Sequence, residues 1–279
     1  MKGVPRLFVC AMAVALAGAV SGSLVWAQAE PDAQIVPFSD PSRPGKVEAQ
    51  LLHGSIVVRG ENRRDVSVVM RGGAPVRERN DRPVPPGMKR LNQTAGFEIS
   101  EERNEIKIEA SSLRPSNASL EIRVPLRTNL ELGSINGQTI TVENVEGEIE
   151  IESLNGSVTL TNVAGSVLAN TQNGPITVSL ARVMADKAMA FTSFNGKVDV
   201  TMPGSIKANL KMRSDNGDIF TDFDVQLQQA PPGGRTTRGR NGTRTQIEVN
   251  RSIYGSVNGG GPEIELRSFN GTIYLRKGQ

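Results

Sequence analysis

A short phrase, Ser or Thr followed by any residue, Asn and Gly, recurs six times in this 279-residue chain. The phrase occupies Ser134–Gly137, Ser153–Gly156, Thr171–Gly174, Ser193–Gly196, Ser214–Gly217 and Ser268–Gly271. Its successive asparagines are 19, 18, 22, 21 and 54 residues apart. Self-similarity at a period near 20 residues indicates a repeat architecture, in which each unit buries its apolar face against its neighbours.

The glycines of the repeat are followed by alternating apolar and polar residues. The apolar ones fall at the second and fourth places, as in the pairs Ile149 and Ile151, Val158 and Leu160, Ile176 and Val178, Val198 and Val200, and Ile273 and Leu275. A period of two predicts short strands with one buried and one solvated face. After Gly137 the apolar residues come one place later, at Ile140 and Val142, which predicts a β-bulge there.

Glycines also recur at half the long period, which sets the size of one unit. From Gly137 to Gly174 they are spaced by 10, 9, 9 and 9 residues, enough for a strand and a turn. We therefore expect an all-β fold, a repeat-built β-solenoid with about 18–20 residues and two strands per coil. Equivalent strands would then stack in parallel, and the asparagine side chains could form a hydrogen-bonded ladder.

An antiparallel β-meander or sandwich is the alternative, because Asn-Gly also suits type I′ hairpin turns. The phrase, however, stands only at alternate turns, and the turns between read Val145-Glu-Gly147 and Val163-Ala-Gly165. A two-sided coil explains this difference between turns, so the pattern favours the solenoid.

Residues 1–29 have the pattern of a secretory signal peptide. Lys2 and Arg6 precede an apolar stretch, and Ala27-Gln28-Ala29 matches the small-x-small cleavage pattern. We expect an exported protein, periplasmic, at the cell surface or secreted, with a mature chain that begins near Glu30 and has no transmembrane segment. The only cysteine, Cys10, would leave with the signal, so no disulfide or thiol chemistry is expected.

The mature chain divides into a Pro-rich extended leader at 30–45 and a β-repeat domain at 46–279. Two stretches without apolar alternation, 71–95 and 226–246, are predicted to be flexible insertions. Alternation predicts further strands ahead of the clear repeats, at 46–59, 65–70, 96–99, 105–109 and 119–124.

The stretch Val124–Gly137, followed by Val-Glu-Gly-Glu-Ile-Glu-Ile-Glu-Ser-Leu-Asn-Gly156, resembles the bacterial putative-adhesin family of β-strand-repeat domains, a domain of unknown function. The resemblance covers residues 120–279 closely and 46–119 loosely. It implies an exported, all-β, solenoid-like domain, and it supplies no catalytic residues.

Residue types that carry chemistry are sparse in this chain. His53, the only histidine, precedes Gly54 where later repeats place Asn, so we interpret it as a turn residue rather than part of a catalytic relay or metal site. Glu148, Glu150 and Glu152 alternate with apolar residues and should share the solvated face of one strand. We predict no catalytic, metal-binding or cofactor-binding residues, and hence no enzyme activity and no cofactor.

The insertion at 226–246 carries arginines and no acidic residue, which predicts contact with an anionic partner. The arginines are Arg235, Arg238, Arg240 and Arg244. Nucleic acid is disfavoured as that partner, because the insertion has no aromatic residue to stack on a base.

Together these patterns predict an exported, non-enzymatic β-repeat protein with a structural, adhesin-like or binding role at the cell envelope. The expected partner is an envelope polymer or another protein. Two alternatives remain: a carbohydrate-active β-helix enzyme, and an envelope scaffold that self-assembles through open strand edges.

Overall fold

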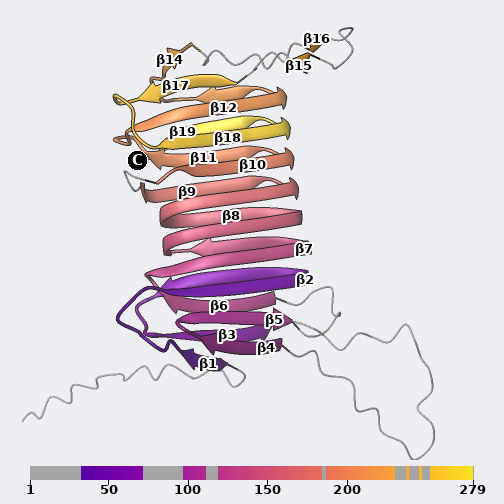
Figure 1. Ribbon diagram of the computed structural model, residues 1–279, viewed down its shortest axis with the longest axis vertical. Helices are drawn as coiled ribbons and strands as arrows, with labels where there is room; N and C mark the ends of the chain where they lie inside the picture. Colours follow the sequence, from indigo (N-terminus) through magenta and orange to yellow (C-terminus); the bar gives the residue numbers. More distant parts are fainter. Residues whose placement is uncertain are drawn as a thin grey trace, which may run out of the picture. The chain divides into compact units, whose positions relative to one another are not determined.

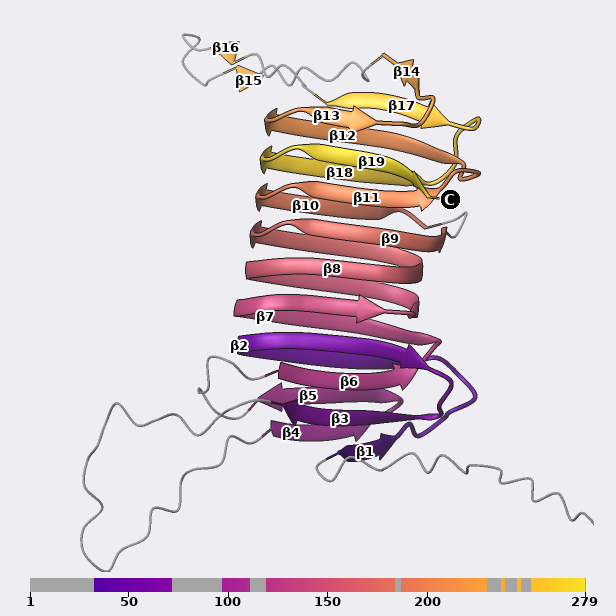
Figure 2. The same ribbon diagram turned by 180° about the vertical axis from the view of Figure 1, so that it is seen from behind.

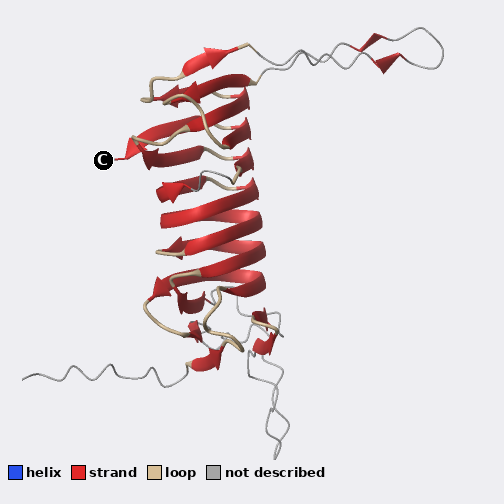
Figure 3. Ribbon diagram, turned by 60° about the vertical axis from the view of Figure 1, so that its left-hand side comes forward, coloured by secondary structure: helices blue, strands red, loops and turns tan. Residues whose placement is uncertain are grey.

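The computed structural model describes residues 33–71, 97–110, 119–183, 187–229, 237–238, 245–246 and 252–278. The chain divides into two units, Met1–Pro31 and Asp32–Gln279, and every described residue belongs to the second. Figure 3 shows that its regular elements are strands. No helix long and apolar enough to cross a membrane occurs among these residues. The predicted signal peptide and its cleavage site lie outside them.

The middle of the stack is a series of coils in chain order (Figure 1). It is formed by β7 (Thr128–Glu143), β8 (Glu146–Asn173), β9 (Ile176–Val183), β10 (Met189–Asn195) and β11 (Val198–Pro203). We call these strands the central coils. Strand β7 pairs with β8, β8 with β9 and β10, and β9 with β11, all in parallel. The predicted parallel solenoid is therefore confirmed over the antiparallel alternative.

The first coil of the domain does not occupy the first place in the stack. Strand β2 (Gly45–Glu61) pairs in parallel with β7 on one side. On its other side it pairs, again in parallel, with β5 (Glu105–Ala110) and β6 (Ser119–Pro125). The coil nearest the N-terminus is therefore inserted between two coils that follow it in the sequence.

The last coil is inserted in the same way. Strands β18 (Glu263–Asn270) and β19 (Ile273–Gly278) lie between β10–β11 on one side and β12 (Ala208–Asn216) and β13 (Ile219–Thr221) on the other. Figure 2 shows β18 and β19, in yellow, between orange strands. We call β2 and β18–β19 the inserted coils. Although Asn270 follows Asn216 by 54 residues in the sequence, it does not follow it in the stack. Asn270 stacks between Asn195 and Asn216.

Cations on β2 reach both of the coils that flank it. The Lys46 ammonium lies 3.3 Å from a carboxylate oxygen of Glu105 in β5 and 2.6 Å from one of Glu131 in β7. At the other end of the strand, Arg59 lies 2.8 Å from Glu121 in β6 and 3.0 Å from Glu143 in β7. Acidic residues on both neighbours thus match the basic residues of the inserted coil.

Antiparallel strands cover both ends of the parallel stack. At one end β3 (Asp65–Arg71) pairs with β6, β1 (Gln34–Pro37) with β3, and β4 (Phe97–Glu102) with β5. At the other end β17 (Ile253–Val257) pairs with β12, and β14 (Gln226–Gln228) with β17. A two-residue pair, β15 (Thr237–Arg238) and β16 (Thr245–Gln246), stands apart from this sheet.

These end strands refine the expected domain organisation. Part of the predicted leader is the strand β1, and Phe38 just after it is buried in the core. The first residues of the predicted insertion at 226–246 form β14. Of the insertion predicted at 71–95, only Arg71, the last residue of β3, is among the described residues.

The core between the two layers of strands is aliphatic, as the alternating pattern predicted. In one row of inward residues, Ala49, Leu132 and Ile151 stand in register on neighbouring coils. Further along, the fully buried Phe191 lies in register between Ala169 and Leu266. A large side chain beside a small one fills the space between coils, and burying each large one contributes about 1.5–3 kcal/mol.

The asparagines of the repeat form a ladder along one corner of the stack. Each donates from Nδ2 to Oδ1 of the asparagine on the neighbouring coil. The bonds are Asn155 to Asn136 at 3.1 Å, Asn173 to Asn155 at 2.9 Å, Asn195 to Asn173 at 2.8 Å, Asn270 to Asn195 at 2.7 Å, and Asn216 to Asn270 at 2.9 Å. The ladder predicted for a solenoid is therefore confirmed, and it runs through the inserted C-terminal coil.

Glycine follows each ladder asparagine because the coils approach closely there. A Cβ atom at Gly196 would overlap the carbonyl oxygen of Gly174 on the next coil. The predicted bulge is present, since the register between β7 and β8 shifts between Asn136 and Thr139. His53 stands opposite Asn136 in the register, so it occupies the asparagine position as interpreted, although this position lies within strand β2 and not in a turn.

Candidate functional site: an apolar groove across the coils

The second, variable residue of the Ser/Thr-x-Asn-Gly phrase points out of the stack, because the Ser or Thr before it points inward. The Ser or Thr that opens the phrase is buried or half-buried, and in four of the six phrases it donates to the glycine carbonyl of the adjacent coil. The hydroxyls of Ser134 and Ser153 have no hydrogen-bond partner among the described residues. Ser193 Oγ donates to Gly174 O at 2.9 Å, and Ser268 Oγ donates to Gly196 O at 3.0 Å. Strand alternation then places the following residue on the outer surface.

At this outward position most coils carry a large apolar residue. We define the apolar stripe as Leu52, Ile135, Leu154, Phe194 and Phe269, whose exposed fractions lie between 38 and 47%. Gln172 interrupts the stripe between Leu154 and Phe194. Neighbouring strands lie about 4.7–4.9 Å apart, so the stripe extends about 24 Å along the stack. Contiguous exposed apolar surface of this kind marks interaction sites.

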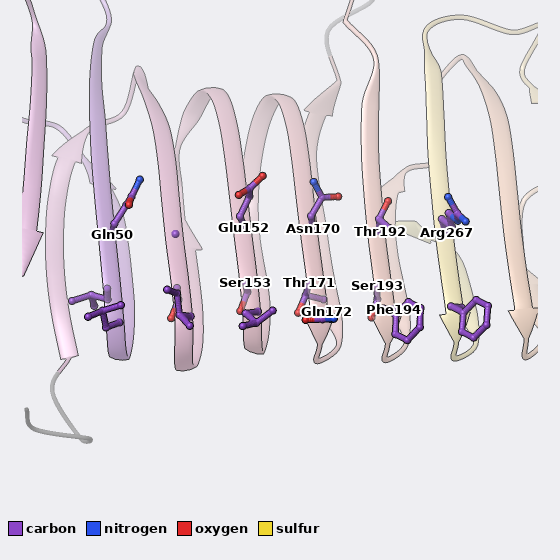
Figure 4. Close-up of a pocket in the computed structure, with 17 residues that line it drawn as sticks. Gln50, Glu152, Ser153, Asn170, Thr171, Gln172, Thr192, Ser193, Phe194 and Arg267 are labelled. Carbon is purple, nitrogen blue, oxygen red and sulfur yellow. The ribbon is translucent and has the colours of Figure 1, made fainter. Parts of the chain in front are cut away.

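The stripe forms the floor of a groove of about 860 Å³. One wall is a row of polar side chains two residues earlier on each strand, and Figure 4 shows them standing side by side. We define the polar flank as Gln50, Glu152, Asn170, Thr192 and Arg267. Gly133 occupies the same row on β7, where it leaves the wall open.

The stripe ends in two stacked aromatic rings. The ring centroids of Phe194 and Phe269 lie 4.7 Å apart, and the ring planes are 3° from parallel. Phe194 belongs to the central coil β10 and Phe269 to the inserted coil β18. Such offset-stacked pairs contribute about 0.5–1.5 kcal/mol beyond the area they bury.

Several charges near the polar flank on the same face are paired across coils. Lys46 pairs with Glu131 at 2.6 Å and Lys211 with Glu265 at 3.1 Å. Among the described residues, Glu152 and Arg267 form no such ion pair. Three coil intervals separate them, which corresponds to about 14 Å. The groove therefore presents one acid and one base that remain available to a ligand.

Charge clusters outside the groove are structural. Glu121 is buried and accepts hydrogen bonds from Arg59 of β2, Arg71 of β3 and Arg123 of β6. Burial opposes ionisation of this carboxyl, but the hydrogen bonds from Arg71 and Arg123 outweigh it and lower its pKa. The three arginines neutralise the carboxylate, so the cluster joins strands and leaves no reactive group.

Asp199 on β11 forms a similar cluster with the inserted coil. Arg276 on β19 lies 2.7 Å from one carboxylate oxygen, and Lys197 lies 3.3 Å from the other. Burial again opposes ionisation, and the hydrogen bonds from Arg276 and Lys197 lower the pKa of Asp199. In the described part of the chain no group of His, Cys, Asp and Glu is arranged to hold a metal ion.

The structure describes only some of the candidate residues that the sequence indicated. Arg235, Arg240 and Arg244 lie outside the described residues, and Arg238 belongs to β15, whose side chains are not described. Of the glutamates expected on a solvated face, Glu148 pairs with Lys187 and Glu152 lines the groove.

Sequence analysis missed the apolar stripe, although a signal for it was present. The variable position of the phrase is apolar in four of its six occurrences, which is unusual for an outward turn residue. The residues are Ile135, Leu154, Phe194 and Phe269. Leu52 could not be added from the sequence, because its coil lacks the phrase and is inserted out of order.

Two solved structures resemble this chain. A putative cell adhesion protein from Clostridium sporogenes is 11% identical, with 89% of this chain and 100% of that chain covered and a TM-score of 0.41. A putative adhesin from Bacteroides fragilis is 9% identical, with 88% of this chain and 95% of that chain covered and a TM-score of 0.27. No curated protein matches the chain.

A family model, described as Toastrack DUF4097, matches residues 92–258. The match covers more than half of the chain, including the central coils and the coil of β12 and β13. Both inserted coils, β2 and β18–β19, lie outside the matched residues. The coils that this model matches carry the repeated phrase from Ser134 to Gly217. The chain belongs to the Toastrack DUF4097 family.

Proposed function

We propose that this protein is an exported, non-enzymatic binding protein of the cell envelope, and that the groove is its contact surface. The observation that carries the proposal is the apolar stripe. It brings five large, partly exposed side chains into one line on a stack of hydrogen-bonded coils. A rigid surface of this kind binds without a large ordering cost.

The chemistry of the groove supports binding rather than catalysis. Among the described residues that line it, Glu152 carries the only carboxylate. Glycoside hydrolysis ordinarily uses two carboxylates about 5–10 Å apart. The carbohydrate-active enzyme considered as an alternative therefore finds no support in the lining of this groove.

The other alternative, a self-assembling scaffold, would need open strand edges at the ends of the stack. Strand β17 covers the edge of β12, and β3 covers that of β6. The described strands left at the edges are short, with three to six residues in β1, β4, β13 and β14, and short edge strands disfavour end-to-end assembly. The export part of the proposal depends on the signal-peptide pattern, and the mass of the exported protein tests cleavage before Glu30.

The envelope role is tested by co-sedimentation with isolated envelope fractions. The mature protein is compared with a Leu154→Asp/Phe194→Asp double variant, called the groove variant. The matched control is Ile35→Asp, which places the same charge on an exposed apolar residue of β1, outside both the groove and the 226–246 segment. We expect the wild type and the control to sediment while the groove variant stays in solution. If none sediments, the envelope role is wrong, and if the groove variant sediments fully, the groove is not the contact.

A second contact is proposed for the arginines of the 226–246 segment, which would attract anionic envelope polymers. A variant with Arg235, Arg238, Arg240 and Arg244 all changed to Ala should bind less at low salt and equally at high salt, because screening removes the attraction. Equal sedimentation at low salt would show that these arginines make no contact.

A further inference from the structure

We propose that the groove binds an extended polypeptide segment of a partner protein. The segment would place apolar side chains on the apolar stripe, an acidic residue at Arg267 and a basic residue at Glu152. This inference deepens the proposed function, because it depends on the groove being a binding surface.

The direction of the groove determines how a peptide can be recognised. The groove crosses the strands, and the backbone groups of those strands are already engaged in parallel pairing on both sides. A ligand therefore cannot add a strand to this sheet and must be held by side chains. Peptide recognition of this kind is typical of polyproline II segments in apolar grooves.

The spacing of the coils fits that conformation. A polyproline II segment rises about 3.1 Å per residue and has three residues per turn, so the same face returns after about 9.3 Å. Two coil intervals span about 9.4–9.8 Å. Every third side chain of the peptide can thus contact every second coil. In a β-strand the same face returns after two residues, or about 6.6 Å, which matches neither one nor two coil intervals. The whole stripe of about 24 Å corresponds to about eight residues in this conformation.

The charges of the polar flank give the peptide a register. Glu152 and Arg267 have no ion-pair partner among the described residues, while two nearby pairs on the same face, Lys46–Glu131 and Lys211–Glu265, join neighbouring coils. Complementary charges on a ligand set its position and its specificity more than its affinity. At a separation of about 14 Å, the matching base and acid would stand four or five residues apart.

Polar groups within the groove favour a peptide over a lipid chain. Gln172 interrupts the apolar stripe, and Asn170 stands beside it in the polar flank. An acyl chain would cover these amides without a hydrogen-bond partner, at a cost in free energy. The backbone N–H and C=O groups of a peptide can pair with both.

The aliphatic part of the stripe favours a peptide over a glycan. Leu52, Ile135 and Leu154 form the half of the stripe that has no aromatic ring. A sugar polymer would set its hydroxyl groups against this surface, where no partner meets them. Phe194 and Phe269 each turn one ring face toward the other, which leaves fewer open faces for sugar rings.

The inference is tested with a phage-displayed library of random dodecapeptides, selected on the full mature protein after depletion on the groove variant. We expect enriched peptides with apolar residues at every third position and with a base and an acid four or five residues apart. Synthetic copies should bind the groove variant at least about tenfold more weakly and the Ile35→Asp control as they bind the wild type. No enrichment, or equal affinity for the groove variant, would overturn the inference.

A change of charge tests the assigned register. Arg267→Glu should weaken binding of an enriched acidic peptide by about tenfold, and replacing the peptide acid by Lys should restore it. Unchanged affinity of the acidic peptide for Arg267→Glu would show that the register is wrong. Arg267 lies on the exposed face of β18, and thermal unfolding of the variant checks that the coil is intact.

The two experiments separate this inference from the proposed function. Envelope binding that depends on the groove, without any selected peptide, would overturn the peptide inference and leave the envelope role standing. Phosphatidylglycerol vesicles and purified glycan strands, added as competitors, would then identify the occupant as lipid or sugar. Peptide binding without envelope sedimentation would leave the peptide inference standing and overturn the envelope role.

Discussion

The central coils and the inserted coils reach the same stacked geometry by different routes. Central coils follow one another every 18–22 residues, while β18–β19 enters the stack from the far end of the chain. Even so, Asn270 takes its place in the ladder between Asn195 and Asn216 with bonds of 2.7 and 2.9 Å. Position in the stack therefore depends on the fit between coils and not on chain connectivity.

The same comparison bears on the groove. Central coils supply its middle, with Ile135, Leu154 and Phe194. Inserted coils supply both ends, with Leu52 from β2 and Phe269 from β18. The full length of the apolar stripe exists only when both insertions are in place.

Removing the inserted C-terminal coil should have the largest effect. A chain ending at Gly261 loses the strands between β10–β11 and β12–β13, together with the buried residues Ile264, Leu266, Ile273 and Leu275. At about 1.5–3 kcal/mol for each side chain, the loss approaches the whole stability of a typical domain. We expect circular dichroism of this chain to show less strand signal and a lower unfolding temperature than the full mature chain, because β12 and β17 lose the coil on which they stack.

The matched control for this truncation is a chain that lacks only Lys277, Gly278 and Gln279, beyond the last buried residue, Leu275. It should unfold close to the wild-type temperature. If the chain ending at Gly261 unfolds at that temperature too, β18–β19 is not an integral part of the stack.

Equivalent core positions provide a direct test of whether the two kinds of coil are equally well packed. Leu132 on β7 and Leu266 on β18 are both buried in the same inward row. Leu132→Ala and Leu266→Ala should each lower the free energy of unfolding by about 2–5 kcal/mol, because each leaves a cavity. Denaturant titration measures both, and a much smaller loss for Leu266→Ala would show that the inserted coil is loosely held.

The ion pairs around β2 test what holds the N-terminal inserted coil. Glu121→Gln leaves Arg59, Arg71 and Arg123 without their shared carboxylate and should cost about 1–3 kcal/mol at pH 7. Because folding lowers the pKa of Glu121, its contribution is present above the unfolded value of about 4.3 and is lost as the pH falls through the folded value.

The difference between wild type and Glu121→Gln in free energy of unfolding should therefore shrink below about pH 4. Urea unfolding at pH 7, 5 and 3 measures this difference. A difference that stays constant over this range would mean that the carboxylate charge does not hold β2.

The asparagine ladder should give the smallest effect. Asn195→Ala removes the ladder bonds to Asn173 and Asn270 at the junction between central and inserted coils. Asn155→Ala removes two ladder bonds within the central coils, together with a bond of 3.3 Å to the Ile135 carbonyl. Because these bonds are exposed, each should contribute in the lower part of the typical range of about 0.5–1.5 kcal/mol, so both variants should lose about 1–2 kcal/mol. A loss confined to Asn195→Ala in thermal unfolding would mean that the junction depends on the ladder more than the centre does.

Much of the fold could be predicted because the signals are local and repeat. The alternation of apolar and polar residues predicted the buried rows, and the Ser/Thr-x-Asn-Gly phrase predicted the asparagine ladder. The shift of the apolar residues by one place after Gly137 predicted the bulge. Only part of the groove, its apolar stripe, could be predicted from such local signals. The apolar residues at the outward position can be recognised in the sequence. The residues of one wall, such as Thr192 and Arg267, share no residue type and follow no sequence pattern, so they could not be predicted.

The sequence by itself determined the coil: its period, its inward and outward residues, and the Asn-Gly corner, since each depends on residues within about 20 positions. Only the tertiary structure decided the order of the coils. Coils with the same corner and the same aliphatic rows can stack on one another in several orders. The choice is made by contacts between distant segments, such as Lys46 with Glu131 and Phe194 with Phe269, and that choice aligns the apolar stripe into one groove.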